Sequence, residues 1–291
     1  MIGILRPSAN DPLTEVMRRV LGELGYVEGQ NIAVEWRFAD GRNDRLPALA
    51  AELVRLKPDA LVTGGNLAIR ALQEATTTIP IVAVSDDMVG ERHVASLPRP
   101  GGNVTGVSIL ASELNVKRLG LLKEAIPRAS RVAILWHSAG EALDLSNMTA
   151  SARSLGVELM AFEVRGMEDL DGAFKEAVQW RANAVNLLAS PQLHALSRTI
   201  IDLAARHRLP TIYQWGEAAA AGGLMAYGPT VPDMYRALFE LLGRILKGAK
   251  PADLPVQQPT KFELAINLKT AKALGLTIPP SILLRADRVI E

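Results

Sequence analysis

A chain of 291 residues is longer than a single ordinary core requires, so its length predicts about two domains. Its 32 basic and 31 acidic side chains leave a formal charge of +1, which gives no field to concentrate nucleic acid or an anionic membrane, so we expect no nucleic-acid partner. The absence of cysteine excludes disulfides, thiolate metal sites and cysteine nucleophiles.

Short apolar runs recur through the first part of the chain and predict five strands, at residues 2–5, 32–39, 60–65, 79–85 and 104–109. Helical patterns lie between them. Leu46, Leu49, Ala50 and Leu53 fall at i, i+3, i+4 and i+7 on one helix face, and a further helix is predicted to begin near Val89. This alternation predicts an α/β fold, with a parallel sheet covered by helices on both faces.

The stretch "LPRPGGNVTG", residues 97–106, stands directly before the fifth run and is rich in proline and glycine. It precedes a strand, at the end of a parallel sheet opposite to the one where ligands bind. We interpret it as the tight turn that stops a helix and starts the strand, with a ligand or partner contact as the alternative.

A second series of five runs follows, at residues 131–138, 157–164, 184–190, 209–214 and 222–228. Two such series predict two similar lobes, each with its own doubly wound sheet. In each series the second run alternates most clearly between apolar and polar residues, as an edge strand does. This favours the strand order 2-1-3-4-5 in both lobes.

The chain after Gly228 follows neither series: it contains a long helix, a proline-rich linker, the short strand "FELAIN" and another helix. We interpret it as a return between the lobes. Residues 1–107 and about 231–255 then form the amino-terminal lobe, residues 108–230 and about 256–291 form the other, and the ligand cleft lies between them. A third small subdomain would give the same pattern.

Candidate ligand-binding residues follow from the rule that open α/β sheets bind ligands at the carboxyl ends of their strands. Small polar groups beside aromatic rings suit a small ligand with one polar and one flat apolar part. The candidates are Ser8, Asn10, Phe38, Gly65, Asn66, Ser85, Asp86 and Asp87 in the first lobe, and Trp136, Ser138, Ser190, Tyr213, Trp215 and Tyr227 in the second.

Several of these candidates have an alternative structural role. Trp136 and Tyr213 could plug strand ends, and Ser85 and Ser190 could cap the helices that follow them. Asp86 and Asp87 could hold an ammonium group through charge-assisted hydrogen bonds, or one of them could cap a helix.

Enzymatic signatures are missing from the sequence, which contains no G-x-G-x-x-G after its first strand, no P-loop, no H-E-x-x-H and no G-x-S-x-G. The four histidines lie in unrelated segments, so we expect neither a metal nor a cofactor. No apolar run approaches the roughly 20 residues that span a bilayer, so membrane insertion of this chain is not expected.

Segments along almost the whole chain resemble the ABC transporter substrate-binding protein family that includes tryptophan- and tyrosine-binding members. The resemblance is carried by "IPIVAVSDDMVGERHVASLPRPGGNVTG", "AARHRLPTIY" and above all "RILKGAKPADLPVQQPTKFELAINLKTAKALGLTIPPSILLRADRVIE". Family members often have "DPVG" after the fourth strand. Here Asp87, Val89 and Gly90 match that motif, and Met88 replaces the proline.

The resemblance implies a type I periplasmic binding fold, with two Rossmann-like lobes joined by a three-strand hinge. It also implies a monomer that binds a small-molecule solute without catalysis and presents it to an ABC transporter permease. Such a protein works in the periplasm or elsewhere outside the cytoplasm, so an export leader is expected to have been removed from this chain.

The leading hypothesis is therefore a solute receptor that closes on an aromatic amino acid or a related solute. Two other classes stay open. The ligand-sensing core of a transcription regulator has the same two lobes but needs an additional helix-turn-helix, and an α/β enzyme needs an acid, base or nucleophile that we could not assemble from the sequence.

Overall fold

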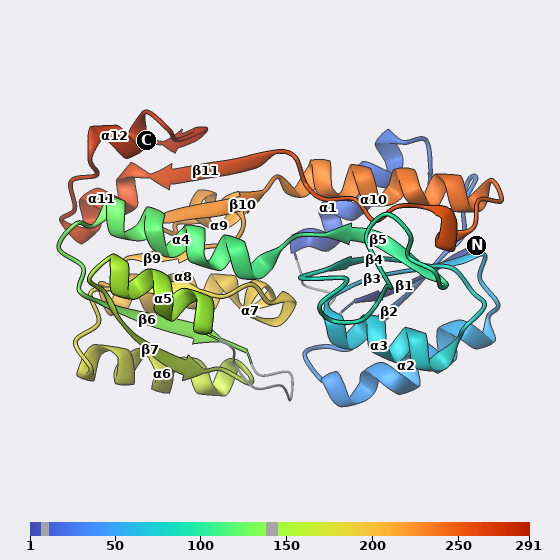
Figure 1. Cartoon of the computed structure of the whole chain (residues 1–291), viewed down its shortest axis with the longest axis horizontal. Coiled ribbons are helices and arrows are strands. Elements are labelled where there is room, and N and C mark those ends of the chain that lie inside the picture. Colours follow the sequence, from blue (N-terminus) through green and yellow to red (C-terminus); the bar gives the residue numbers. More distant parts are fainter. Residues whose placement is uncertain (7–11, 138–144) are drawn as a thin grey trace. The chain divides into compact units, whose positions relative to one another are not determined.

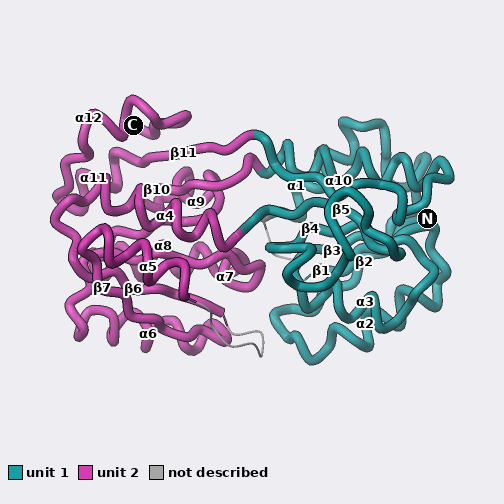
Figure 2. Tube along the Cα trace, in the orientation of Figure 1, with its two compact units in different colours: residues 1–110, 231–260 teal, residues 111–230, 261–291 magenta. Residues whose placement is uncertain are grey.

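The computed structural model describes residues 1–6, 12–137 and 145–291. The chain divides into two compact units (Figure 2). Unit 1 comprises residues 1–110 and 231–260, and unit 2 comprises residues 111–230 and 261–291. The chain therefore passes from one unit to the other three times, at residues 110–111, 230–231 and 260–261.

Unit 1 contains a five-stranded parallel sheet in the order β2-β1-β3-β4-β5. Helices α2 and α3 cover one face, where Leu53 and Ile69 pack on strand residues such as Leu61, and α1 and α10 lie together on the other (Figure 1). The strands are β1 (Ile2–Arg6), β2 (Val34–Phe38), β3 (Ala60–Gly64), β4 (Ile81–Ser85) and β5 (Val104–Ser108). The helices are α1 (Pro12–Glu23), η1 (Asn43–Arg45), α2 (Leu46–Arg55), α3 (Asn66–Ala75), α10 (Val231–Leu246) and η2 (Pro251–Asp253).

Unit 2 contains a seven-stranded sheet in the order β12-β11-β10-β9-β8-β6-β7, in which only β11 runs antiparallel to its neighbour β10. The strands are β6 (Arg131–Trp136), β7 (Glu158–Glu163), β8 (Ala184–Leu187), β9 (Thr211–Tyr213), β10 (Met225–Pro229), β11 (Phe262–Asn267) and β12 (Arg288–Ile290). Each face of this sheet is covered by its own set of helices and its own apolar core.

One core of unit 2 lies under helices α4 (Ala111–Ala125), α5 (Ser146–Ser154), α11 (Leu268–Leu274) and α12 (Pro280–Leu283). The other lies under helices α6 (Met167–Gln179), α7 (Pro191–Ala195), α8 (Ser197–Arg206) and α9 (Gly216–Ala220). The central strands β6, β8 and β9 are buried on both faces and consist of almost continuous apolar residues, which is why they are recognisable in the sequence.

The predicted strand order 2-1-3-4-5 is confirmed in both units, with β2 and β7 as edge strands. The end of the chain contributes to both units. Helix α10 belongs to unit 1, whereas β11 and β12 extend the sheet of unit 2 beyond the predicted five strands.

The helix predicted near Val89 is wrong: residues 86–103 form turns and bends. The Asp87 carboxylate accepts the backbone N–H groups of Val89 and Gly90 at 3.1 and 2.9 Å, and Arg92 adopts a left-handed φ of 58°. Side chains of this kind compete with helical hydrogen bonds for the backbone and favour turns.

Residues 97–103 lead into β5 as expected, so the interpretation of this stretch as the start of a strand is confirmed, whereas the helix that it was expected to stop is absent. The Ser96 hydroxyl bonds to the backbone of Arg99, and Gly101 has a left-handed φ of 80° just before β5 begins. Gly106, inside β5, has a φ of 150°, and a Cβ there would lie 1.8 Å from the carbonyl oxygen of Ala83. Only glycine therefore allows β5 to lie this close to β4.

Candidate functional site

The structure places most predicted site residues at the carboxyl ends of strands, each within its own unit. Ser8, Asn10 and Ser138 lie outside the described residues. The others follow or end strands β2, β3 and β4 in unit 1, or β6, β8 and β9 in unit 2, except Tyr227, which lies within β10.

In unit 1 the ends of β3 and β4 are joined by two predicted site residues. The Ser85 hydroxyl, which is buried, donates to Oδ1 of Asn66 at 2.9 Å. Gly65, with a left-handed φ of 92°, turns the chain into α3 and donates its N–H to the Val84 carbonyl at 2.9 Å. Ser85 therefore contacts the first residue of α3 instead of capping a helix that follows it.

Asp86 and Asp87 follow β4 and are both half-buried. One oxygen of Asp87, Oδ1, accepts both N–H groups of the turn described above. The alternative that Asp86 or Asp87 caps a helix is wrong, because a turn and not a helix follows them, and the Asp87 carboxylate holds that turn. A Cβ on Gly90 would lie 2.4 Å from Oδ2 of Asp87, so glycine leaves room for the carboxylate.

Phe38 ends the edge strand β2 and stacks on Trp36, with ring centroids 5.8 Å apart and planes 8° apart. The guanidinium of Arg18 lies 4.8 Å from the centre of the Trp36 ring, a distance typical of a cation–π contact. Phe38 is half-buried in this stack, so part of its ring surface remains exposed.

Arg6, the last residue of β1, is a buried cation that the sequence analysis did not select, because the predicted strand ended at Leu5. Its side chain is only 2% exposed. A Cβ on Gly64 would lie 3.2 Å from its Nη1, so the glycine at the end of β3 makes room for the guanidinium. The alternation of Ile2, Ile4 and Arg6 is the signal that could have identified it as a buried residue.

In unit 2, Trp136 and Tyr227 are half-buried and pack on the core beneath α4 and α5. Tyr227 stacks on Phe262, with centroids 6.1 Å apart and planes 16° apart. Partial burial, reinforced by the Asp287 carboxylate, raises the pKa of the Tyr227 phenol, whereas Arg118 acts in the opposite direction. Strands β9 and β8 separate the two aromatic residues, so their backbones stand roughly 14 Å apart along the sheet.

Tyr213 lies on the face of the sheet opposite to Trp136 and Tyr227. Trp215 follows two residues later, and the two side chains are buried, with 1% and 5% of their surface exposed. Tyr213 belongs to the core beneath α8, and burial strongly raises the pKa of its phenol. The Trp215 ring packs edge-on against the His194 ring, with ring centroids 6.3 Å apart. Tyr213 therefore fills the end of its strand, which was the structural alternative to ligand binding. Trp215 is also enclosed by the protein.

Ser190 is the N-cap of α7. Its hydroxyl oxygen accepts the N–H groups of Gln192 and Leu193 at 3.2 and 3.3 Å. This is the capping role considered from the sequence, and it satisfies donors that the first turn of a helix leaves without partners.

Arg118 of α4 is a second buried cation that the sequence analysis missed. It is fully buried, donates to the Tyr227 carbonyl at 2.9 Å and also donates to the Asn115 side chain. The Asn115 carbonyl in turn accepts from Asn186 of β8 at 3.2 Å, and its Oδ1 accepts the N–H of Ala189 at 3.4 Å. One helix thus fixes β8, the chain just after it and β10 through polar contacts.

The sequence signal for Arg118 was its spacing. It lies four residues after Leu114 and four before Leu122, both buried, so it falls on the apolar face of α4.

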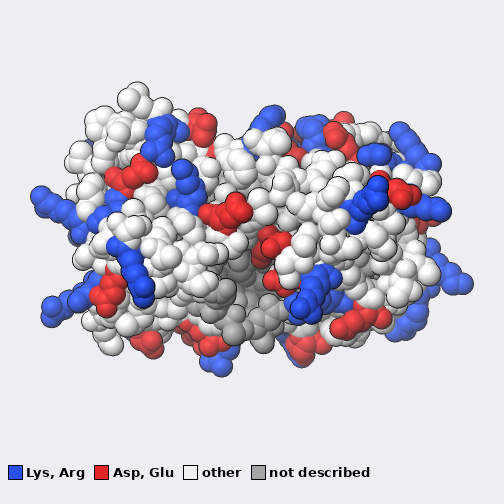
Figure 3. Space-filling view, in the orientation of Figure 1, with Lys and Arg blue, Asp and Glu red and all other residues white. Residues whose placement is uncertain are grey.

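Charges of both signs are interspersed over the face of the molecule seen in Figure 3, in keeping with the net charge of +1. Among the described residues, no group of three or more His, Asp or Glu side chains is arranged to hold a metal ion. In the same part of the chain, no helix combines the length and hydropathy of a membrane span.

Known proteins match this chain over nearly its full length. The family model described as "ABC transporter substrate binding protein" matches residues 4–290. A curated "Tyrosine-binding protein" from Clostridioides difficile (strain R20291) is 24% identical over 265 residues, which cover 89% of this chain and 75% of that protein.

Two solved structures are also similar. The conserved domain protein from Vibrio cholerae O1 biovar El Tor has a TM-score of 0.89 and 26% identity, over 99% of this chain and 98% of that one. The ABC domain from Streptococcus pneumoniae in complex with L-Trp has a TM-score of 0.88 and 25% identity, over 99% of each chain. The two units have the architecture of type I periplasmic binding proteins. The protein therefore belongs to the ABC transporter substrate-binding protein family.

Proposed function

We propose that this protein is the extracytoplasmic solute receptor of an ABC importer and that it binds an aromatic amino acid, or a related aromatic solute, without changing it chemically. The observation that carries the proposal is the full-length similarity to a structure that contains L-Trp. The relative named for tyrosine binding supports the same ligand class.

The side chains at the strand ends suit the two parts of such a ligand. In unit 2, Trp136 and Tyr227 keep part of their rings exposed and offer apolar surface to an aromatic side chain. In unit 1, Asn66 and Asp86 offer groups for an ammonium, and the Arg6 guanidinium offers a cation for a carboxylate. An α-amino acid carries both of these charged groups on one carbon.

The proposed mechanism is closure of a hinge formed by the three connecting segments. A ligand that contacts residues of both units stabilises a closed state, and it shifts the equilibrium only by as much as it binds that state more tightly. The permease then recognises the closed, loaded receptor. A decrease in the radius of gyration on ligand addition, measured by small-angle X-ray scattering, is the expected sign of closure.

The ligand is tested by isothermal titration calorimetry on protein that has been unfolded and refolded to remove any molecule carried through purification. We expect saturable binding of L-Trp, L-Tyr or L-Phe, and recovery of the ligand unchanged by mass spectrometry. Glycine and indole, which each lack one half of the ligand, should bind much more weakly. Binding of sugars alone would overturn the aromatic ligand, and conversion of the ligand would overturn the receptor function.

The site is tested with a matched pair of tryptophan variants in unit 2. Trp136→Ala removes exposed ring surface at a carboxyl strand end and should weaken binding by roughly tenfold or more. Trp180→Ala is the control, because Trp180 follows α6 and contacts Arg131 at the amino end of β6. Equal losses in the two variants would show that Trp136 has no special role in binding.

A further inference from the structure

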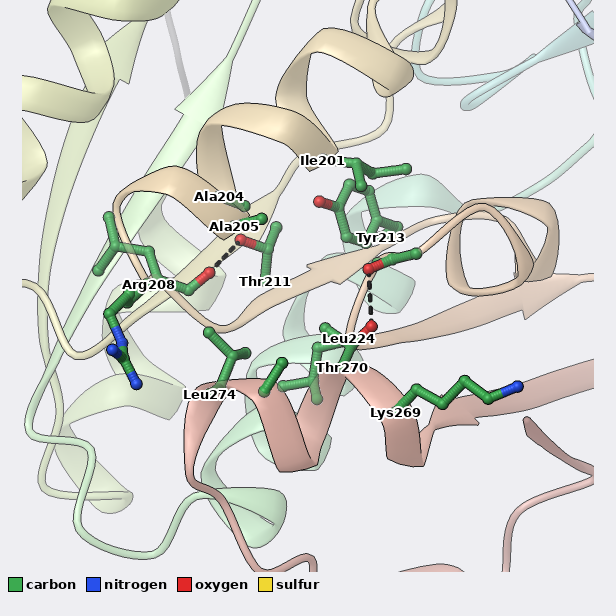
Figure 4. Close-up of a pocket in the computed structure, with 14 residues that line it drawn as sticks. Ile201, Ala204, Ala205, Arg208, Thr211, Tyr213, Leu224, Lys269, Thr270 and Leu274 are labelled. Atoms are coloured by element: carbon green, nitrogen blue, oxygen red, sulfur yellow. Dashed lines mark hydrogen bonds between the residues drawn. The ribbon is translucent and has the colours of Figure 1, made fainter. Parts of the chain in front are cut away.

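Unit 2 contains a pocket whose lining lies mostly at the amino edge of its sheet, with Tyr213, the last residue of the short strand β9, also in the lining. It has a volume of about 420 Å³, within the range of small-molecule sites. Helix α8, the start of β9, the chain before β10 and helix α11 line it (Figure 4). The start of β9 and the residues before β10 mark the amino edge of the sheet, so the pocket is distinct from the proposed aromatic amino-acid site.

The pocket floor is apolar and buried. Ile201, Leu209 and Leu224 are each no more than 6% exposed. Two glycines before β10 keep the space open: Gly222 has a φ of 115°, and a Cβ on Gly223 would lie 2.6 Å from the Tyr213 ring. Side chains at these two positions would be strained or would collide, so the local sequence maintains the cavity.

The pocket rim is cationic. Arg208, in the loop between α8 and β9, and Lys269, on α11, line it and are both exposed, and no Asp or Glu is among the lining residues. Figure 4 shows their side chains at opposite ends of the row of lining residues on α11 and the α8–β9 loop. Within the described ranges, neither cation forms an ion pair, so neither charge is neutralised by the protein there.

Tyr213 also lines the pocket, although its hydroxyl is buried. The Tyr213 side chain is 1% exposed, and its hydroxyl makes no hydrogen bond to any described residue, although Thr211 lies near enough to influence its pKa. A buried polar atom without a partner is costly. This hydroxyl has almost no surface that water can reach, so it is not a contact for a ligand in the pocket.

We infer that this pocket is a second small-molecule site and that it binds an organic carboxylate with an apolar body of medium-chain alkyl or single-ring size. The apolar floor takes the body, and the carboxylate lies at one end of the pocket, beside either Arg208 or Lys269. The site lies wholly within unit 2, so it does not require hinge closure or the proposed amino-acid ligand.

Octanoate is the probe, because it has no aromatic ring for the proposed amino-acid site to recognise. Calorimetry should show saturable binding of octanoate and much weaker binding of 1-octanol and octylammonium, which share its chain but not its charge. Since the cations are exposed and stand at opposite ends, one of the variants Arg208→Gln and Lys269→Gln should weaken binding by roughly two- to fivefold and the other should change it little. The double variant should lose no more affinity than the weaker-binding single variant, and unchanged binding by the double variant would overturn the inference.

Two further variants locate the site. Ala273→Trp, on an exposed position of α11 that lines the pocket, should abolish octanoate binding. Lys272→Gln, the neighbouring exposed lysine outside the lining, should leave it unchanged, as should Trp136→Ala. Absence of octanoate binding at millimolar concentration, equal binding of 1-octanol, or full binding by a folded Ala273→Trp variant would each overturn the inference. Failure of aromatic amino acids to bind would leave this test intact.

Discussion

Replacing Arg118 by methionine should destabilise unit 2, because this arginine is fully buried and links α4 to the Tyr227 carbonyl and the Asn115 side chain. Methionine has a similar length and fills much of the same space, so the variant removes mainly the guanidinium and its hydrogen bonds.

The magnitude follows from two opposing effects. Each hydrogen bond from a charged donor contributes roughly 1.5–3 kcal/mol, and its loss leaves a buried acceptor without that partner. Removing a buried charge also relieves its desolvation, which offsets part of the loss. We expect the free energy of unfolding of unit 2 to fall by about 2–4 kcal/mol.

The assay is urea unfolding followed by tryptophan fluorescence in a Trp36→Phe background. Of the four tryptophans, only Trp36 lies in unit 1, so the remaining three report on unit 2 alone. This matters because the two units need not unfold together. Arg128→Met, at an exposed position just beyond α4, is the matched control and should change the unfolding free energy by less than about 0.5 kcal/mol.

A loss below about 1 kcal/mol in Arg118→Met would refute the argument, since the guanidinium would then not be holding the strand end. Arg118→Lys adds a second check. It keeps the charge but cannot reach two acceptors with the same fork of donors, so it should also be destabilised. A lysine variant as stable as the parent would show that charge alone, without the forked geometry, is sufficient.

Three further outcomes are expected. Gly106→Ala should lower the free energy of unfolding by more than about 3 kcal/mol or prevent folding, because the added Cβ meets the backbone of β4. Gly102→Ala, with open space around it, should lower it by less than about 1 kcal/mol. Similar denaturation midpoints for the two variants would contradict this. Burial, with a neighbouring arginine, lowers the pKa of His93 to about 4, so the unfolded chain takes up a proton that the folded protein does not. Stability should therefore fall as the pH drops from about 6.5 to 4, by at most about 1.4 kcal/mol per pH unit, and His93→Gln should flatten this decline; an unchanged pH profile would argue against a neutral buried ring. Ser190→Ala should lower the stability of unit 2 by about 1 kcal/mol through loss of the α7 cap. Ser197→Ala should be nearly neutral, because Ser197 is the first residue of α8 and the N-cap of that helix is Leu196.

Some site residues were recognisable from the sequence because strand ends are recognisable. Asn66 and Ser85 were selected separately, as polar residues after two buried runs, and the sheet order brings them within hydrogen-bond distance. Arg6 and Arg118 were missed because arginine usually lies at the surface, and burial of one depends on cavities and acceptors supplied by distant segments. Only the spacing of their apolar neighbours indicated otherwise.

Helix prediction failed in one place for a related reason. The segment after Asp87 has a composition compatible with a helix, but one carboxylate oxygen accepts two backbone N–H groups and holds a turn. The periodicity of a sequence does not reveal which of two competing acceptors a backbone N–H will choose.

The sequence by itself determined the class of the fold, the family and the order of the first five strands in each unit, because buried parallel strands and amphipathic helices leave local periodic patterns. The addition of β11 and β12 to the sheet of unit 2 depended on the tertiary structure. Tertiary structure alone decided which face each aromatic residue occupies. Tyr213 is enclosed on one side of the sheet of unit 2, while Tyr227 remains partly exposed on the other. It also decided that a cationic pocket forms between α8 and α11, since residues more than 60 positions apart meet there only through long-range packing.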